Sequence, residues 1–285
     1  MRICRFLHPQ GDIRVGRVEP DETVLDLSTT GITRLVQLLE DEEAVNKVRK
    51  LDKDAGDRLS LSELSLCAPL ENQEVWAAGV TYRRSKTARM AESDFSATAY
   101  DRVYSAARPE LFFKSLGEKV CGPNSPIGIR KDARWSVPEP ELALVFNSQG
   151  KLAGCTIGND MSSRDIEGEN LLYLPQAKIY QHSCALGPWL ELGVQEDIAR
   201  QWRIELEIRR DSATVFSGET QVNEIQRSFE ELAEFLFRSQ RFPNGVVLLT
   251  GTGIVPPDHF TLKAGDQVNI AISGIGRLTN TVVAV

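Results

Sequence analysis

The segment Pro138-Glu139-Pro140-Glu141-Leu142-Ala143-Leu144-Val145-Phe146 joins two carboxylates to an uninterrupted apolar run. The apolar part predicts a β-strand, and residues two apart on a strand point to the same face. Glu139 and Glu141 are therefore expected side by side, with no basic residue between them. Two adjacent carboxylates repel each other unless a cation or a proton lies between them. The spacing indicates a cation site, and the simpler alternative is a solvated strand face.

A third carboxylate, Asp160, follows a second apolar stretch, Leu152-Ala153-Gly154-Cys155-Thr156-Ile157-Gly158-Asn159. This stretch also predicts a strand, so Asp160 is expected at a strand end, where active-site loops commonly begin. With Glu139 and Glu141 it would complete an all-oxygen site. Such sites favour Mg²⁺, whereas zinc favours the His and Cys ligands that these positions lack. We therefore expect Mg²⁺, with Mn²⁺ or Ca²⁺ as substitutes.

Composition and charge narrow the classes of protein to which the chain can belong. Its 285 residues are 41% hydrophobic, enough for the core of one large domain and a small one. The net charge of −7 and the pI near 5.2, without a clustered basic stretch, argue against nucleic acid or an anionic membrane as partner. The five cysteines are odd in number and widely spaced, which is typical of reduced thiols in a cytoplasmic protein. The beginning of the sequence lacks the apolar segment of a signal peptide, and no later apolar run approaches membrane-spanning length.

Changes of pattern predict a small N-terminal α/β domain, residues 1–65, and a larger domain, residues 66–285. Residues 2–27 read as short strands, and Ile32, Leu35, Leu38 and Leu39 have helical spacing. A polar stretch over residues 52–57 precedes the boundary.

Strands dominate the larger domain. They are expected over residues 141–146, 190–192, 203–209, 246–250, 267–273 and 279–283. One helix is expected over residues 228–239, opened by a capping box between Ser228 and Glu231. Many strands with few helices predict an α+β, β-rich fold with a rolled sheet.

Three motifs in the larger domain occur together in the order and spacing of one known family. They are Glu139 to Val145, Gly158 to Asp165, and Ala177-Lys178 through Leu186-Gly187-Pro188. Shorter matches occur at residues 79–82, 112–114 and 250–253. Over roughly residues 70 to 285 the chain resembles the catalytic domain of the fumarylacetoacetate hydrolase family, and the resemblance implies that family's mixed β-roll.

The resemblance implies a particular site. Glu139, Glu141 and Asp160 would bind Mg²⁺, the substrate would be a chelated 2-oxo-carboxylate or 1,3-dicarbonyl compound, and Lys178 would lie close to the substrate's oxygens. A divalent cation fits this chemistry, because as a Lewis acid it stabilises an enolate. Without the motif, Lys178 would be interpreted as an ordinary surface lysine.

One departure from the hydrolase pattern is informative. Many hydrolases of this family have a histidine three residues after the tyrosine of a Gly-x-x-Tyr segment, and here Ser85 takes its place after Tyr82. Without that imidazole the usual general base for carbon–carbon hydrolysis is absent. The segments 170–178 and 108–114 instead resemble the branch of 2-keto-3-deoxy sugar acid dehydratases, which implies that Glu110 is the proton-transfer residue.

The resulting prediction is a Mg²⁺-dependent lyase that dehydrates a 2-keto-3-deoxy sugar acid through a metal-stabilised enolate, for example 2-keto-3-deoxyarabinonate to 2-oxoglutarate semialdehyde. Glu110 and Lys178 would share the proton transfers. One alternative is a Mg²⁺-dependent hydrolase or decarboxylase of an acylpyruvate, against which Ser85 counts. The other is an inactive metal-binding paralogue, against which the intact site residues count. The family implies a homodimer or homotetramer.

Further residues are candidates for substrate binding. Arg83 and Arg84 offer guanidinium donors for the substrate's carboxylate or hydroxyls, and solvent-facing side chains are the alternative for both. Thr252 lies in a glycine-rich turn whose backbone N–H groups can approach an anionic oxygen, and a plain strand-to-loop turn is the alternative. Residues 83–107 are polar and are interpreted as a mobile lid, an exposed helix, or both.

Overall fold

The strand that contains Glu141, β10 (Pro140–Phe146), begins directly after Glu139 and lies inside a large mixed sheet. In the computed structural model, which describes residues 1–51, 55–82 and 103–285, this sheet has 11 strands in the order β4-β3-β2-β1-β13-β11-β10-β16-β6-β7, with β5 paired to β1. The other strands of the sheet are β1 (Arg2–Leu7), β2 (Ile13–Val18), β3 (Thr23–Asp26), β4 (Arg58–Ser60), β5 (Ser65–Cys67), β6 (Glu74–Gly79), β7 (Glu110–Ser115), β11 (Leu152–Asp160), β13 (Cys184–Leu192) and β16 (Val246–Leu249).

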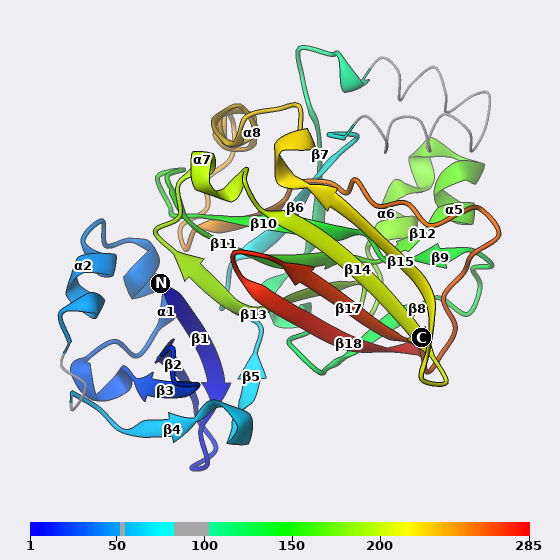
Figure 1. Cartoon of the computed structure of the whole chain (residues 1–285). Coiled ribbons are helices and arrows are strands. Elements are labelled where there is room, and N and C mark those ends of the chain that lie inside the picture. Colours follow the sequence, from blue (N-terminus) through cyan, green and yellow to red (C-terminus); the bar gives the residue numbers. More distant parts are fainter. Residues whose placement is uncertain (52–54, 83–102) are drawn as a thin grey trace.

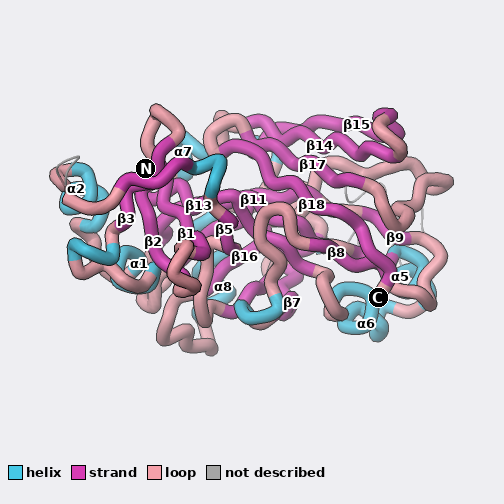
Figure 2. The backbone as a smooth tube through the Cα atoms, turned by 90° about the horizontal axis from the view of Figure 1, so that it is seen from below, coloured by secondary structure: helices cyan, strands magenta, loops and turns pink. Residues whose placement is uncertain are grey.

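A second sheet of five strands has the order β15-β14-β17-β18-β8 in the described part of the chain. Figure 1 shows its yellow and red strands beside the green strands of the first sheet, and Figure 2 shows the same arrangement from below. A short pair of strands, β9 with β12, lies at the end of the molecule where the C-terminus is found. The bounds are β8 (Pro126–Ile129), β9 (Ser136–Val137), β12 (Ser162–Ser163), β14 (Arg203–Arg210), β15 (Ala213–Gln221), β17 (Gln267–Ile272) and β18 (Gly276–Ala284).

The uninterrupted apolar run of β10 follows from burial on both faces. Leu142 and Leu144 belong to the core cluster that also contains the inward residues of β14, β17 and β18. Ala143 and Val145 belong to a second cluster, which includes the apolar residues of α1. A strand between two cores needs apolar side chains at every position, because neither face meets water.

Helices are short and peripheral. They are α1 (Leu35–Leu39), α2 (Ala44–Arg49), α5 (Arg164–Glu169), α6 (Leu174–Lys178), α7 (Glu196–Ala199) and α8 (Phe229–Phe237), with 3-10 turns at Ser28–Thr30, Leu61–Glu63, Gly117–Lys119, Leu171–Tyr173 and Val222–Glu224. The expected helix at residues 228–239 is α8, which ends two residues earlier. The hydroxyl of Ser228 accepts a hydrogen bond from the N–H of Glu231 at 3.0 Å, but the carboxylate of Glu231 pairs with Arg227. The predicted capping box is therefore formed on one side.

The N-terminal strands join the same sheet as the larger domain. β1 pairs with β13 through Arg2↔Glu191 and Ile3↔Leu190, so the two regions share backbone hydrogen bonds. The prediction of an α+β, β-rich fold is confirmed. The domain boundary at residues 65/66 stays a prediction. Within the described ranges, no helix is long and apolar enough to cross a membrane.

Candidate metal centre and active site

One edge of the large sheet gathers the candidate site. β10 begins there, and its antiparallel neighbours β11 and β16 end there. β6 is parallel to β16 and also ends at this edge, where β7 begins. In an antiparallel pair, one strand begins where its partner ends. The topology therefore brings together residues from five strands that are up to 170 positions apart in the sequence.

The three predicted metal ligands lie together at this edge. Carboxylate oxygens of Glu139, Glu141 and Asp160 are all within 4.8 Å of one another. The N–H of Asp160 donates to the carbonyl of Glu139 at 3.0 Å, which fixes the backbone of Asp160 against that of Glu139. The three residues are 4%, 1% and 1% exposed, so the alternative of a solvated strand face is wrong.

Burial makes this cluster costly without a cation. The pKa of Glu141 is raised well above its usual value, chiefly because burial disfavours the charged form, and then because of repulsion by Asp160 and Glu139. The N–H of Gly251 donates to Glu141 Oε2 at 2.5 Å. The glycine turn predicted to meet an anionic oxygen thus contacts one of the three clustered carboxylates, and the φ of Gly251, +86°, explains why glycine occupies this position.

Lys178, the last residue of α6, points into the carboxylate cluster. Its ammonium donates to Glu139 Oε2 at 2.8 Å, to Asp160 Oδ2 at 3.1 Å and to the hydroxyl of Ser162 at 2.6 Å. The side chain is 1% exposed, so it is not a surface lysine. The centre of the Phe112 ring lies 5.8 Å from the ammonium.

Glu110 and Thr252 line the same cavity as Lys178 and the three carboxylates. The cavity volume of about 10 Å³ is room for roughly one water-sized sphere. Glu110 opens β7 opposite Gly79, and a Cβ atom at residue 79 would lie 2.1 Å from Glu110 Oε2. Glycine at position 79 therefore makes room for the carboxylate.

Sequence reasoning missed three charged residues of this site. Arg164 is 2% exposed and donates to Glu139 Oε1 at 2.8 Å, Lys114 is completely buried and pairs with Asp160, and Glu167 is buried in the cavity wall. Arg164 and Lys114 lie within the family motifs, but no spacing rule pairs Arg164 with Glu139, 25 positions away, or Lys114 with Asp160, 46 positions away. A charged residue inside an apolar strand was the available signal for Lys114.

The described residues fit a divalent cation. Five carboxylates line the cavity, and three cationic side chains either line it or contact those carboxylates. In their ionised forms these groups leave a formal charge of −2, which one divalent cation balances. Oxygen ligands in a buried cluster are the donor set of a hard cation such as Mg²⁺. The carboxylates are Glu110, Glu139, Glu141, Asp160 and Glu167, and the cations are Lys114, Arg164 and Lys178.

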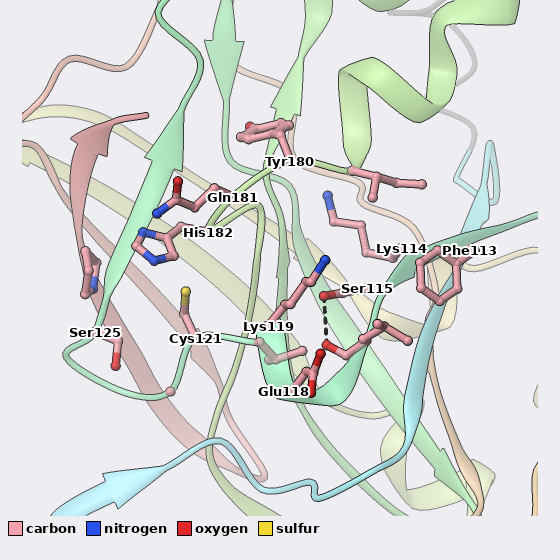
Figure 3. Close-up of a pocket in the computed structure, with 15 residues that line it drawn as sticks. Phe113, Lys114, Ser115, Glu118, Lys119, Cys121, Ser125, Tyr180, Gln181 and His182 are labelled. Atoms are coloured by element: carbon pink, nitrogen blue, oxygen red, sulfur yellow. Dashed lines mark hydrogen bonds between the residues drawn. The ribbon is translucent and has the colours of Figure 1, made fainter.

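Arg83, Arg84 and Ser85 lie outside the described residues, as does most of the proposed lid. A larger groove of about 810 Å³ adjoins the site on the far side of Lys114. Figure 3 shows Lys114, Tyr180 and His182 among its lining residues.

Comparison with known proteins agrees with this geometry. The family described as fumarylacetoacetate (FAA) hydrolase C-terminal matches residues 74–283, and the chain belongs to this family. It is 40% identical to a protein named "Probable 2-keto-3-deoxyxylonate dehydratase" of Haloferax volcanii, over 92% of this chain and 86% of that one. It is 36% identical to 2-dehydro-3-deoxy-D-arabinonate dehydratase of Saccharolobus solfataricus, over 92% of this chain and 90% of that one.

Solved structures extend the comparison. The apo form of 2-keto-3-deoxy-D-arabinonate dehydratase superimposes with a TM-score of 0.86 at 32% identity, covering 100% of this chain and 99% of that one. The same enzyme complexed with magnesium and 2,5-dioxopentanoate gives a TM-score of 0.85 at 31% identity, with the same coverage. The predicted family and the similarity to its dehydratase branch are thus confirmed.

Proposed function

We propose that the protein is a Mg²⁺-dependent dehydratase of 2-keto-3-deoxy sugar acids, which converts a substrate such as 2-keto-3-deoxyarabinonate to 2-oxoglutarate semialdehyde. The observation that carries the proposal is the one small cavity shared by the carboxylate cluster, Lys178 and Glu110. The relatives named as dehydratases support the class of reaction. The 2,5-dioxopentanoate in the related magnesium complex is the same compound as 2-oxoglutarate semialdehyde.

Glu139, Glu141 and Asp160 would hold the cation. When bound, Mg²⁺ supplies Lewis acidity that polarises a keto oxygen and lowers the cost of removing a neighbouring proton. Because the ligand set consists of oxygen atoms alone, we propose Mn²⁺ and Ca²⁺ as ions that can occupy the same site.

Glu110 and Lys178 would carry the proton transfers. Dehydration removes a proton from C3 and the hydroxyl from C4, and the hydroxyl leaves as water once it is protonated. The C3=C4 bond formed in this way then becomes the C5 aldehyde of the product when C5 and its hydroxyl each lose a proton and C3 and C4 each gain one. One group must accept a proton and another must supply one. The Glu110 carboxylate is suited to accept, and the Lys178 ammonium, held between Glu139 and Asp160, is suited to supply.

Substrate contacts are proposed for Thr252, Arg83 and Arg84. Thr252 is 3% exposed and lines the cavity, and its hydroxyl accepts a hydrogen bond from the N–H of Ile254 at 3.2 Å and donates to the carbonyl of Ile254 at 3.4 Å, so a ligand there would replace the second of these contacts. The two arginines follow Tyr82, which is buried. Their guanidinium groups would bind the substrate's carboxylate or hydroxyls.

Assembly and location are also proposed. We expect a homodimer or homotetramer, because apolar side chains such as Leu116, Leu172 and Ile179 are 42%, 83% and 39% exposed in the single chain. A cytoplasmic location agrees with five unpaired cysteines.

The test is to incubate the purified protein with Mg²⁺ and 2-keto-3-deoxyarabinonate in one tube and with an acylpyruvate in another, and to follow both by proton NMR. We expect 2-oxoglutarate semialdehyde in the first tube and no cleavage in the second. Cleavage of the acylpyruvate alone would replace the proposal by carbon–carbon hydrolysis. Calorimetric Mg²⁺ binding without turnover of either compound or of other 2-keto-3-deoxy sugar acids would indicate an inactive paralogue.

A further inference from the structure

We infer that Lys114 is a positioning residue, which holds the metal ligand Asp160 and the backbone of Lys178 in their working places. The inference rests on the proposed function, because it concerns how the same site is assembled. Lys114 is distant in sequence from both residues: it lies on β7, whereas Asp160 lies on β11 and Lys178 on α6.

The face of β7 that meets the site carries Glu110 and Phe112. Alternate residues of a strand point to one face. Glu110 and Phe112 line the cavity, and the ring of Phe112 lies against the ammonium of Lys178. Lys114 lies at a shift of register between β7 and β6, and its ammonium reaches Asp160. Lys114 also lines the groove shown in Figure 3.

The side chain of Lys114 is completely buried, and among the described residues it contacts segments that carry site residues. It forms an ion pair with Asp160 Oδ1, donates to the carbonyl of Met161 at 3.0 Å, and donates to the carbonyl of Lys178. The ring of Tyr180 lies 6.0 Å from the nitrogen. A buried lysine is tolerated only when such acceptors replace its lost hydration.

These contacts join three segments that carry site residues. Lys114 comes from β7, Asp160 ends β11, Met161 follows it, and Lys178 ends α6. Asp160 Oδ1 faces Lys114 and Asp160 Oδ2 faces Lys178, so the two lysines fix both oxygens of one metal ligand. Loss of the Lys114 ammonium would free Asp160 on one side and release the end of α6.

A second role for Lys114, that of a counter-charge alone, makes the opposite prediction. Removing a positive charge beside a cation site reduces repulsion, so a counter-charge role predicts tighter Mg²⁺ binding. A positioning role predicts weaker binding, because groups that orient metal ligands typically change metal affinity 10-fold to 100-fold. The sign of the change therefore decides between them.

The experiment compares wild type, Lys114→Met and the control Lys119→Met by calorimetric Mg²⁺ titration. Lys119 lies on the wall of the same groove, is exposed, and ends the 3-10 turn Gly117–Lys119. We expect Lys114→Met to bind Mg²⁺ at least about 10-fold more weakly, and Lys119→Met to match wild type. Unchanged or tighter binding in folded Lys114→Met overturns the inference, whereas absence of binding in wild type overturns the proposed function.

Turnover at saturating Mg²⁺ tests the contact of Lys114 with the carbonyl of Lys178 separately from its contact with Asp160. At saturating Mg²⁺, a displaced Lys178 still lowers kcat on the order of 10-fold to 100-fold. Lys114→Gln, which keeps amide donors for the two carbonyls, should recover part of this loss. If neither variant folds, a crystal structure of the Mg²⁺-loaded wild type decides: Lys114 bonded to Asp160 and both carbonyls supports the inference, and a Lys114 turned away from Asp160 overturns it.

Discussion

Each of the three clustered carboxylates, the proposed metal ligands, is contacted by a cationic side chain or an N–H group from elsewhere in the chain. Arg164 and Lys178 hold the two oxygens of Glu139, Lys114 and Lys178 hold those of Asp160, and the N–H of Gly251 holds Glu141. Such outer contacts fix ligand rotamers before a metal binds, which lowers the cost of forming the site.

Glu110→Gln is expected to lower kcat about 10²-fold to 10⁴-fold, because an amide cannot exchange a proton. Mg²⁺ affinity should stay close to that of wild type, since Glu110 is not one of the three clustered ligands. Steady-state kinetics and calorimetry measure the two effects. Glu118→Gln, exposed on the neighbouring groove, is the control and should leave both unchanged. A kcat within threefold of wild type for Glu110→Gln would remove Glu110 from the mechanism.

Gly251→Ala should damage the site more than Gly265→Ala, although both glycines have positive φ, +86° and +91°. A left-handed backbone costs an alanine about 1–2 kcal/mol at either position. At Gly251 the new Cβ would also lie 2.2 Å from Thr81 Oγ1, whereas nothing lies within 4 Å at Gly265. We expect Gly251→Ala to be destabilised by at least about 1 kcal/mol more in urea unfolding, and to bind Mg²⁺ more weakly.

Equal destabilisation of the two alanine variants, with Mg²⁺ binding intact in both, would contradict the role assigned to the Gly251 N–H. Comparison with Gly265→Ala removes the part of the effect that comes from backbone strain alone.

The sequence predicted that Glu139, Glu141 and Asp160 lie together because they follow a local rule, the period of two on a strand and a carboxylate at a strand end, and the structure brings them together. Lys178 and Glu110 were predicted only through a family resemblance, and the structure places both at the same cavity; the roles of all five residues stay predictions. Lys114, Arg164 and Glu167 were missed because their partners are set by tertiary packing. A single sequence contains no local signal for such contacts.

Among the elements, strands were predicted better than helices. β10, β14 and β17 begin or end within one residue of the expected ranges, because each has a long apolar or alternating pattern. The helix expected near residues 32–39 is only α1, Leu35–Leu39, and α5 and α6 were not predicted at all. These are one- to two-turn helices held by tertiary contacts, so they have little periodicity of their own.

Ser228→Ala should destabilise the protein by about 1 kcal/mol, because α8 loses the side chain that accepts from the N–H of Glu231. The apolar face of α8 packs into the main core through Phe229, Leu232 and Leu236, so the loss is expected in global unfolding. Urea denaturation measures it. Ser239→Ala, an exposed position just beyond the helix, should change stability little, and equal effects of the two changes would refute the cap.

At the scale of the whole molecule, one sheet runs from the N-terminal strands through β13 to the site edge. The order of its strands could not be predicted, because pairings such as β16 with β6 join segments far apart in sequence. Sequence patterns specify which segments are strands, and the packing of both cores specifies their neighbours.

Mg²⁺ should raise the melting temperature more at pH 8 than at pH 5.5. Because the pKa of Glu141 is raised in the folded chain, the folded chain keeps a proton that the unfolded chain loses above the ordinary pKa of about 4.5. Without metal, the contribution of Glu141 to stability therefore falls as pH rises toward the raised pKa. Binding Mg²⁺ requires that proton to leave, so binding strengthens over the same interval. Thermal scans with Mg²⁺ or EDTA test this, and an equal shift at both pH values would contradict it.

The most direct measurement is the Mg²⁺ dependence of 2-keto-3-deoxyarabinonate dehydration, set beside calorimetric Mg²⁺ binding in wild type and Glu141→Gln. If the carboxylate cluster holds the ion that the reaction uses, half-maximal turnover occurs at the Mg²⁺ concentration that half-fills the site, and Glu141→Gln loses binding and turnover together. Turnover that persists in EDTA, or that survives in Glu141→Gln at the wild-type Mg²⁺ requirement, would contradict the proposed function.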